Sequence, residues 1–371
     1  MNSNNTLLPD ISQCPAGCPG CRIMLMTPEE CLAEKLRYLH NTLAPWQDKT
    51  HRIETPPPGM QWGYRSRVCL AASHTGSGWH LGLKKHGRVL PVHDCHIHSP
   101  IVRKATNLFV NIMPPPACFP LAFYVQSGAQ VTLVVKTRDL PDMGWLDSDI
   151  LNQLAGIGIE GVWINLHPSA GRRVFAKSGW HLVWGLPVSC DGKGLLYGPS
   201  TFRQVAGSVW EKALNRAEDF LAPTPEDLVI DLYCGTGATL ARWIKKSSKV
   251  VGIEICRESV KCAALNAPGA TILQGMCAQR IPQLEKEISY PHAHRLLYAN
   301  PPGTGIEHEV IDWITSKCRP ERVAYLSCNV ATAKRDIMAL ARAGYCAEHI
   351  IPYDFFPNTR HLECLILLCI R

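Results

Sequence analysis

Long apolar runs are missing from this chain of 371 residues. A membrane-spanning helix needs about 20 consecutive apolar residues, whereas the apolar runs here are only strand-length, so no membrane span is expected. The opening residues, MNSNNTLLPDISQC, lack the basic and apolar regions of a secretory signal, and we therefore expect a cytoplasmic protein. Internal repeats and low-complexity tracts are also missing, so a repeat architecture is not expected.

Charge of either sign is scarce, because charged residues make up 19% of the chain against 46% hydrophobic residues. This balance is typical of a globular protein with a substantial core, and the length suggests two or three domains. The formal net charge of +7 is modest. It permits a polyanionic partner without requiring one, since the basic residues are scattered along the chain.

Cysteine, in contrast, is abundant, with 17 residues. In a cytosolic protein these thiols would be mostly reduced, and their odd number agrees with that. We interpret the cysteines in apolar contexts as small core residues. They are Cys69, Cys118, Cys256, Cys364 and Cys369.

Three cysteines near the start, Cys14, Cys18 and Cys21, have the spacing of metal or iron–sulfur ligands. Three interpretations of this spacing are open. The triplet is also the motif of radical S-adenosylmethionine enzymes, although nothing in the sequence predicts their barrel. A zinc site would need a fourth ligand, such as Cys31 or Cys95, and an iron–sulfur cluster is the third interpretation.

Three regions follow one another along the chain. Residues 1–57 hold the cysteine cluster and a predicted helix, TPEECLAEKLRYLHNTL, with Thr27 as N-cap and Glu30 completing a capping box. Residues 58–198 show the alternation and the Gly, Pro and Ser turns of a β-rich domain, in segments such as RVCLAAS and AQVTLVVKT. Residues 199–371 alternate strands with helices.

The strands expected in residues 199–371 lie in LVIDLYCGTG, KVVGIEI, ATILQG, HRLLYANPPG, RVAYLSCN and HLECLILLCI. They are apolar and rich in β-branched residues, as strands buried on both faces are. Such strands, each followed by a helix, predict an α/β fold with a doubly wound parallel sheet, that is, a Rossmann-like domain.

The ligand of such a sheet lies beyond the carboxyl ends of its strands. The first strand leads into Asp231-Leu-Tyr-Cys-Gly235-Thr-Gly237, whose glycines let backbone N–H groups approach a ligand. The next strand ends in Glu254, which can accept hydrogen bonds from ribose hydroxyls. An acidic residue ahead of Gly-x-Gly is typical of S-adenosylmethionine-dependent methyltransferases rather than of dinucleotide-binding proteins.

Reactive side chains follow or begin three further strands. Asn300 opens Asn-Pro-Pro-Gly303, Cys328 follows RVAYLS, and Glu363 enters the last strand. Amino-methylating enzymes carry an aromatic residue where this chain has Gly303, which argues against N-methylation. A thiolate and a carboxylate at the same edge of the sheet are the two groups that methylation of carbon 5 of a pyrimidine requires. Addition of the thiolate to C6 makes C5 nucleophilic, and a base must then remove the C5 proton.

Six segments in the same order resemble the RNA uracil-5 methyltransferases, which make 5-methyluridine in tRNA and 23S rRNA. They are TFRQV, DLYCGTG, VGIE with a later NA, NPPGTG, YLSCN-x2-T-x3-D and FPNTRHLE, spread over residues 201–363. The resemblance implies that Cys328 is the nucleophile and Glu363 the base. It also implies residues that contact the cofactor or the target base, namely Gln204, Tyr233, Gly235, Gly237, Glu254 and Asn300.

The resemblance further implies two cofactors. One is S-adenosylmethionine, and the other is a [4Fe–4S] cluster held by Cys14, Cys18, Cys21 and Cys95, with zinc as the less favoured alternative. The implied substrate is RNA, either rRNA or tRNA, and we expect a monomer that binds no membrane. The compact rRNA enzymes that have a cluster and no N-terminal OB-like module are the type that the chain resembles most.

Several positions depart from the family pattern. The family has Asp-Pro-Pro-Arg where this chain has Asn300-Pro-Pro-Gly303. Ala206 and Ala238 stand at positions where the family has asparagines. The nucleophile and the base are unaffected. Two alternative functions are therefore kept open: methylation of another position, either cytosine C5 or a ring nitrogen, and RNA binding without catalysis on a methyltransferase scaffold.

Overall fold

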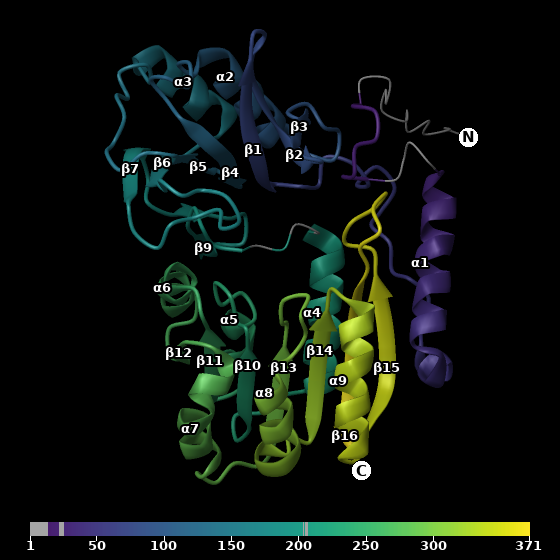
Figure 1. Ribbon diagram of the computed structural model, residues 1–371. Helices are drawn as coiled ribbons and strands as arrows, with labels where there is room; N and C mark the ends of the chain where they lie inside the picture. The colour runs from purple at the N-terminus through teal and green to yellow at the C-terminus, as the bar shows by residue number, and fades with distance from the viewer. Residues whose placement is uncertain (1–13, 22–25, 203, 205–206) are drawn as a thin grey trace, which may run out of the picture. The chain divides into compact units, whose positions relative to one another are not determined.

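Two units of the chain are built around separate sheets in the computed structural model (Figure 1). The structure describes residues 14–21, 26–202, 204 and 207–371. The β-rich unit comprises Met1–Met24, Pro57–Lys193 and Tyr197–Val205, and the α/β unit comprises Leu25–Pro56, Gly194–Leu196 and Ala206–Arg371. Within the described ranges, no helix is long and apolar enough to cross a membrane.

The β-rich unit contains a seven-stranded sheet with the order β3-β2-β1-β4-β5-β6-β7. Its elements are β1 (Arg67–Thr75), β2 (Gly78–Lys85), β3 (Arg88–Pro91), α2 (Pro100–Ile112), β4 (Leu121–Ser127), β5 (Gln130–Val135), α3 (Ser148–Ile157), β6 (Gly161–Leu166) and β7 (Trp180–Gly185). Strands β5 and β6 are parallel, because α3 lies between them in the chain, and the other pairs are antiparallel. Side chains of α2 and α3 pack on one face of the sheet in a shared core. A short ribbon, β8 (Ser189–Cys190) with β9 (Leu196–Tyr197), follows.

The α/β unit contains the second seven-stranded sheet, with the order β12-β11-β10-β13-β14-β16-β15. Its strands are β10 (Leu228–Leu232), β11 (Lys249–Glu254), β12 (Thr271–Gln274), β13 (Arg295–Ala299), β14 (Arg322–Ser327), β15 (Tyr345–Tyr353) and β16 (Glu363–Ile370). Strands β10 to β14 are parallel, as predicted. The expectation that the last strand continues the parallel series is wrong, because β16 is antiparallel to both of its neighbours, β14 and β15. The short connection from β15 to β16 explains this, since a parallel return needs a long crossover.

Helices cover both faces of this sheet and complete the mixed α/β architecture. They are α1 (Pro28–Thr42), the 3-10 segment Ala44–Lys49, α4 (Gly207–Leu221), α5 (Leu240–Trp243), α6 (Arg257–Asn266), α7 (Cys277–Ile288), α8 (His308–Trp313) with a π-helical turn Ile314–Cys318, and α9 (Val330–Arg342). Buried side chains of α1, α7, α8 and α9 form one core with the sheet. Those of α4, α5 and α6 form a second core on the opposite face.

The helix predicted near the start of the chain is α1, and its capping box is present. The side chain of Thr27 accepts a hydrogen bond from the backbone N–H of Glu30 (3.2 Å), and the Glu30 carboxylate accepts one from the N–H of Thr27 (2.7 Å). The chain after α1 then runs along the edge strand β15, through parallel bridges from Thr50 to Ile350 and from Glu54 to Tyr353. The segment from α1 to Glu54 is therefore an integral layer and edge of the α/β unit.

Candidate active site

Cys328 and Glu363 meet at the carboxyl edge of the parallel strands. Cys328 follows the last residue of β14, and Glu363 is the first residue of β16. Ser327 of β14 pairs with Cys364 of β16 as the last pair of this antiparallel ladder, and Cys328 and Glu363 are the residues that adjoin this pair on the two strands. The Glu363 carboxyl is close enough to act electrostatically on the Cys328 thiol. The structure thus brings together the two residues predicted to be nucleophile and base.

The Cys328 side chain is exposed at this edge. Partial burial is the main cause that raises the pKa of its thiol, and the nearby Glu363 raises this pKa further. A Cβ atom added at Gly303 would lie 3.6 Å from Cys328 Sγ, so the backbone of the Asn300–Gly303 loop lines the thiol. Asn329, the N-cap of α9, donates from Nδ2 to the carbonyl of Gly303 (3.1 Å) while its Oδ1 accepts from Ala331 N (3.0 Å). The loop and the start of α9 are therefore held as one piece around the thiol.

Glu363 has the environment of a general base with a raised pKa. The residue is 3% exposed, and burial raises the pKa of its carboxyl to about 8. Its Oε2 has no hydrogen-bond partner among the described residues. A carboxylate that is desolvated and only sparsely hydrogen-bonded accepts a proton readily near neutral pH, which is what a catalytic base requires.

The hydrogen bonds of Asp336 fix the loop beside Cys328. Its Oδ2 accepts from the hydroxyl of Tyr325 (2.8 Å) and from the backbone N–H of Ile306 (3.0 Å). Arg335 donates to Asp336 Oδ1 (2.7 Å) and to the carbonyls of Thr304 and Ile306. Asp336 is the last residue of the YLSCN-x2-T-x3-D motif, but no role for it could be predicted from the sequence. Its burial, at 1% exposure, and its three partners identify it as a positioning residue.

The glycine turn after β10 has the conformation that the motif predicts. Gly235 (φ +56°) and Gly237 (φ +81°) lie in the left-handed region, and a Cβ at Gly237 would come within 2.9 Å of the Ala263 backbone. Glu254, at the tip of β11, accepts hydrogen bonds from Gly235 N (3.1 Å) and Cys256 N (2.7 Å). The turn and the strand tip are therefore joined, with backbone N–H groups and one carboxylate on the same edge.

Three other polar residues support this turn. Tyr233 has a positive φ of 61° and accepts a hydrogen bond from Glu307 N (3.3 Å). Asp231 is fully buried and accepts from Trp243 Nε1 (2.9 Å), and burial raises the pKa of its carboxyl to about 7. The backbone N–H of Asn300 donates to Leu232 O (3.3 Å), which ties β13 to β10 at the same edge. These hydrogen bonds hold the turn and the ends of the neighbouring strands in place.

The remaining predicted residues belong to the β-rich unit. Gln204 is partly buried, and its Oε1 has no hydrogen-bond partner within the described part of the chain. Its neighbours at 203, 205 and 206, including the Ala206 departure, lie outside the described residues.

The predicted metal ligands are Cys14, Cys18, Cys21 and Cys95. All four are partly buried. Burial raises the pKa of the Cys95 thiol, and Cys18 and Cys14 add to the rise, so these thiols are near one another. Across the described ranges, however, no three Cys, His, Asp or Glu side chains have the arrangement of a metal site. The four predicted ligands therefore do not form a metal site in this structure.

Two of the five cysteines expected in the core are exposed, Cys69 and Cys118, so that interpretation is wrong for them. Cys69 lies on β1, where alternate residues face outward, and Cys118 lies in the turn before β4. Cys364 is buried as expected, and Cys256 and Cys369 are partly buried.

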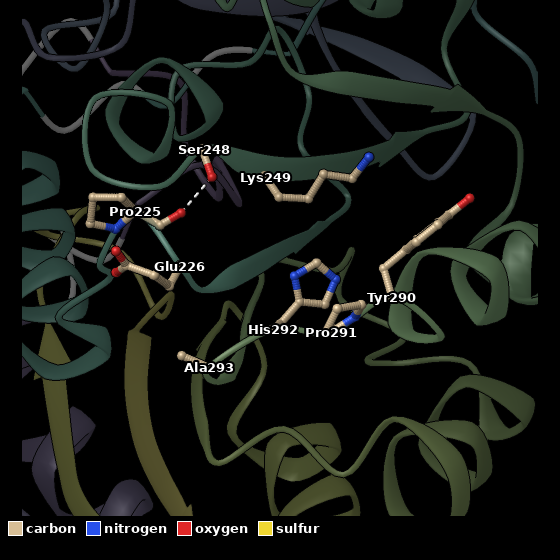
Figure 2. A pocket seen from close by; sticks show the side chains of 8 residues that line it. All are labelled: Pro225, Glu226, Ser248, Lys249, Tyr290, Pro291, His292 and Ala293. Atoms are coloured by element: carbon tan, nitrogen blue, oxygen red, sulfur yellow. Dashed lines mark hydrogen bonds between the residues drawn. The ribbon is translucent and has the colours of Figure 1, made fainter.

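A surface hollow lies at the opposite end of the sheet, by the amino ends of β10, β11 and β13 (Figure 2). It has a volume of about 820 Å³ and is lined by Pro225, Glu226, Ser248, Lys249, Tyr290, Pro291, His292 and Ala293. Ser248 donates a hydrogen bond to the Pro225 carbonyl within it. None of the predicted site residues lines this hollow.

Comparison with known proteins identifies a family. Residues 187–371 match the family described as tRNA (Uracil-5-)-methyltransferase. The chain belongs to this family. The matched region contains β10 to β16 and hence both Cys328 and Glu363.

Relatives extend the similarity to the rest of the chain. An uncharacterised RNA methyltransferase of Thermosynechococcus vestitus is 32% identical over 217 residues, covering 57% of this chain and 47% of the relative. The 23S rRNA (uracil(1939)-C(5))-methyltransferase RlmD of Shewanella baltica is 26% identical over 369 residues, covering 94% of this chain and 79% of the relative. The chain spans about half or less of the length of the first two relatives it matches, at 47% and 37%.

The fold also matches a solved structure. The tRNA (uracil-54, C5)-methyltransferase of Pyrococcus abyssi, in complex with S-adenosyl-L-homocysteine, superposes with a TM-score of 0.68 at 18% identity. The match covers 95% of this chain and 86% of the other. Both the β-rich and the α/β units therefore have counterparts in one methyltransferase fold.

Proposed function

We propose that this protein transfers a methyl group from S-adenosylmethionine to carbon 5 of a uridine in RNA, giving 5-methyluridine. The observation that carries the proposal is the placement of an exposed thiol, Cys328, and a buried carboxyl, Glu363, next to the same Ser327–Cys364 pair of one β ladder. Membership of the uracil-5 methyltransferase family supports the same chemistry.

Cys328 begins the reaction as a nucleophile. Its thiolate adds to C6 of the uracil, and the electrons of the C5–C6 double bond move to form an enolate whose C5 is nucleophilic. S-adenosylmethionine, when bound beside the glycine turn, supplies the electrophilic methyl group that C5 takes. Because Cys328 is exposed, its sulfur is accessible to the target uracil, and the Gly303 backbone leaves room for the uracil ring on one side.

Glu363 completes the reaction as a base. Its carboxylate removes the proton from C5, the electrons of that bond restore the C5–C6 double bond, and the sulfur of Cys328 leaves as thiolate. The raised pKa of Glu363, about 8, makes its carboxylate a stronger base than an exposed glutamate.

The cofactor would be held by the turn after β10 and the tip of β11. Glu254 offers a carboxylate for the ribose hydroxyls, Gly235 and Gly237 let the backbone of the turn approach the cofactor closely, and Tyr233 limits the pocket. Asn300, from the neighbouring strand, offers an amide that can bind cofactor or uracil but cannot accept a proton. We propose Gln204 as a further contact to the target base, on the family resemblance alone.

An iron–sulfur cluster on Cys14, Cys18, Cys21 and Cys95 stays a prediction from the sequence. The electrostatic effect of Cys18 and Cys14 on the Cys95 thiol favours the cluster, whereas the arrangement of the described cysteines is not that of a metal site. Anaerobic purification followed by iron, sulfide and zinc analysis tests it. About four irons per chain with absorbance near 400 nm would support the cluster, and a colourless protein with one zinc would contradict it.

A covalent trap tests the main proposal. Transcripts of tRNA and 23S rRNA containing 5-fluorouridine should form a denaturation-resistant adduct with the wild-type protein, because fluorine at C5 cannot be removed as a proton. Cys328→Ala should form none, whereas Cys190→Ala, which removes another exposed thiol, should react as the wild type does. With uridine transcripts, Glu363→Gln should accumulate the covalent intermediate.

The outcomes separate the alternatives. No adduct with any transcript would favour RNA binding without catalysis. Adducts with 5-fluorocytidine transcripts in place of 5-fluorouridine would favour cytosine C5 as the target. Full turnover by Glu363→Gln would remove this residue from the role of base.

A further inference from the structure

A buried lysine on α1 points at the segment that leads into Glu363. Cys31, Lys35 and Leu39 recur at four-residue spacing on one face of α1, and all three are buried, with Lys35 only 4% exposed. Lysine is rarely buried unless its charge is paired, because desolvating an ammonium group is costly. The position of Lys35 therefore calls for a specific partner rather than for general packing.

That partner is the connection between β15 and β16. Lys35 Nζ forms an ion pair with Asp354 Oδ1 at 2.6 Å, with the two side chains 3% and 10% exposed, and it donates to the carbonyl of Phe356 (3.1 Å). One turn earlier on the helix, the thiol of Cys31 donates to the carbonyl of Thr359 (3.4 Å). One face of α1 thus binds three successive points of residues 354–359.

This connection determines where β16 begins. Asp354 directly follows Tyr353, the last residue of β15, and Tyr353 pairs with Glu363. Within the connection, the Thr359 hydroxyl donates to Phe356 O (2.7 Å) and accepts from His361 N (3.2 Å). The carbonyl that Lys35 binds, that of Phe356, is therefore linked through Thr359 to the residues just before Glu363.

The far side of the connection is also tied to the segment that follows α1. Asp354 N donates to Glu54 O (2.8 Å), and Glu54 N donates to Pro352 O (2.8 Å). The backbone on one side and the ion pair on the other hold Asp354 in one place. The capping box at Thr27 and Glu30 in turn fixes the start of the helix that carries Lys35.

We propose that Lys35 and Asp354 are positioning residues for the base Glu363: their buried ion pair fixes the turn that sets the placement of the Glu363 carboxylate. Neither residue is assigned a role by the reaction chemistry. The inference rests on the proposed function, and it predicts a defect confined to the step that needs the base. A misplaced carboxylate would leave attack by Cys328 intact, since Cys328 is positioned independently by β14, α9 and the loop at Gly303.

The test separates the two steps in the full chain. Adduct formation with 5-fluorouridine transcripts reports attack by Cys328, and 5-methyluridine formation on uridine transcripts reports complete turnover. In Lys35→Met, which keeps an unbranched apolar stem but removes the charge, adduct formation should proceed close to the wild-type rate. Turnover should fall by about 10- to 100-fold, the usual effect of misplacing a catalytic group by about 1 Å. Uridine transcripts should then accumulate as covalent complex.

Three further variants complete the test. Lys35→Arg keeps the charge and should retain more turnover than Lys35→Met. Lys49→Met removes an exposed lysine that pairs with Asp48 at 3.6 Å and should leave both steps unchanged. The double variant Lys35→Met, Asp354→Leu replaces both buried partners by apolar groups, which proteins commonly tolerate without loss of stability, and should show the same split between the two steps.

Each remaining outcome overturns the inference. Equal loss of both steps would show that the pair only supports the fold, as would failure of both the single and the double variant to fold. Unchanged turnover would show that Glu363 is positioned without the pair. If the wild-type protein forms no adduct at all, the proposed function itself fails, and that result is distinct from any of these.

Discussion

Glu363→Gln should remove a pH-dependent instability that the wild-type protein carries. Burial raises the pKa of the Glu363 carboxyl to about 8 from an ordinary value of 4.5. The folded state therefore binds this proton more tightly than the unfolded state does. Because of this linkage, the free energy of unfolding falls as pH rises from 4.5 towards 8, which is the opposite of the usual behaviour of a salt-bridged carboxylate.

The magnitude follows from the pKa difference. One pKa unit corresponds to about 1.4 kcal/mol, so the full difference corresponds to about 5 kcal/mol in the free energy of unfolding. Between about pH 5.5 and pH 8 the unfolded state has largely lost the proton and the folded state still holds most of it, so this window should contain about 3 kcal/mol of the loss. Glutamine fills the same space and does not titrate.

Urea denaturation at several pH values across this window measures the effect. The free energy of unfolding of wild type should fall more steeply with pH than that of Glu363→Gln, by about 3 kcal/mol over the window. Asp231 also titrates with a pKa of about 7, but it is present in both proteins, so the difference between them isolates Glu363. Glu309→Gln, which changes an exposed glutamate, should follow the wild type. Parallel curves for wild type and Glu363→Gln would refute the reasoning.

Three other predictions concern the same edge. The rate of adduct formation with 5-fluorouridine transcripts should rise with pH through the alkaline range, because burial and Glu363 raise the pKa of the Cys328 thiol and the thiolate is the nucleophile; a flat rate would contradict this. Gly237→Ala should weaken binding of S-adenosylhomocysteine by about tenfold or more in calorimetry, since the added Cβ meets the Ala263 backbone at a positive φ. Gly269→Ala, also at positive φ but in open space, should leave that affinity unchanged, and equal effects of the two would be evidence against a role for the turn. Asp336→Asn should lower the free energy of unfolding by about 1 to 3 kcal/mol and slow adduct formation; a variant as stable and reactive as wild type would show that the loop is held without it.

Local signals in the sequence predicted the elements well where local physics determines them. The Thr27–Glu30 capping box marked the start of α1, and apolar β-branched runs marked β10, β11, β13 and β14. The sequence also predicted a glycine turn after β10, where Gly235 and Gly237 have positive φ. In each case the cause lies within a few residues of the effect.

Features that depend on distant residues could not be predicted in this way. The apolar pattern of a strand does not depend on the direction of the strand in the sheet, so the reversal of β16 could not be predicted from the sequence. A lysine on an amphipathic helix is expected on the solvent side, and only the tertiary structure shows that Lys35 is buried against Asp354. The raised pKa of Glu363 likewise depends on burial by both neighbouring strands and by the core that β16 enters.

The reversal of β16 makes the register of one ladder decisive for catalysis. Successive side chains of a strand point to opposite faces of the sheet, so a slip of one residue would exchange the faces of Glu363 and Cys364. Cys364 belongs to the core that contains α9, and its thiol could not replace the carboxylate. Pairing on both sides, with β14 and with β15, protects against such a slip. A single-residue deletion inside β16 should therefore abolish turnover even if the protein still folds.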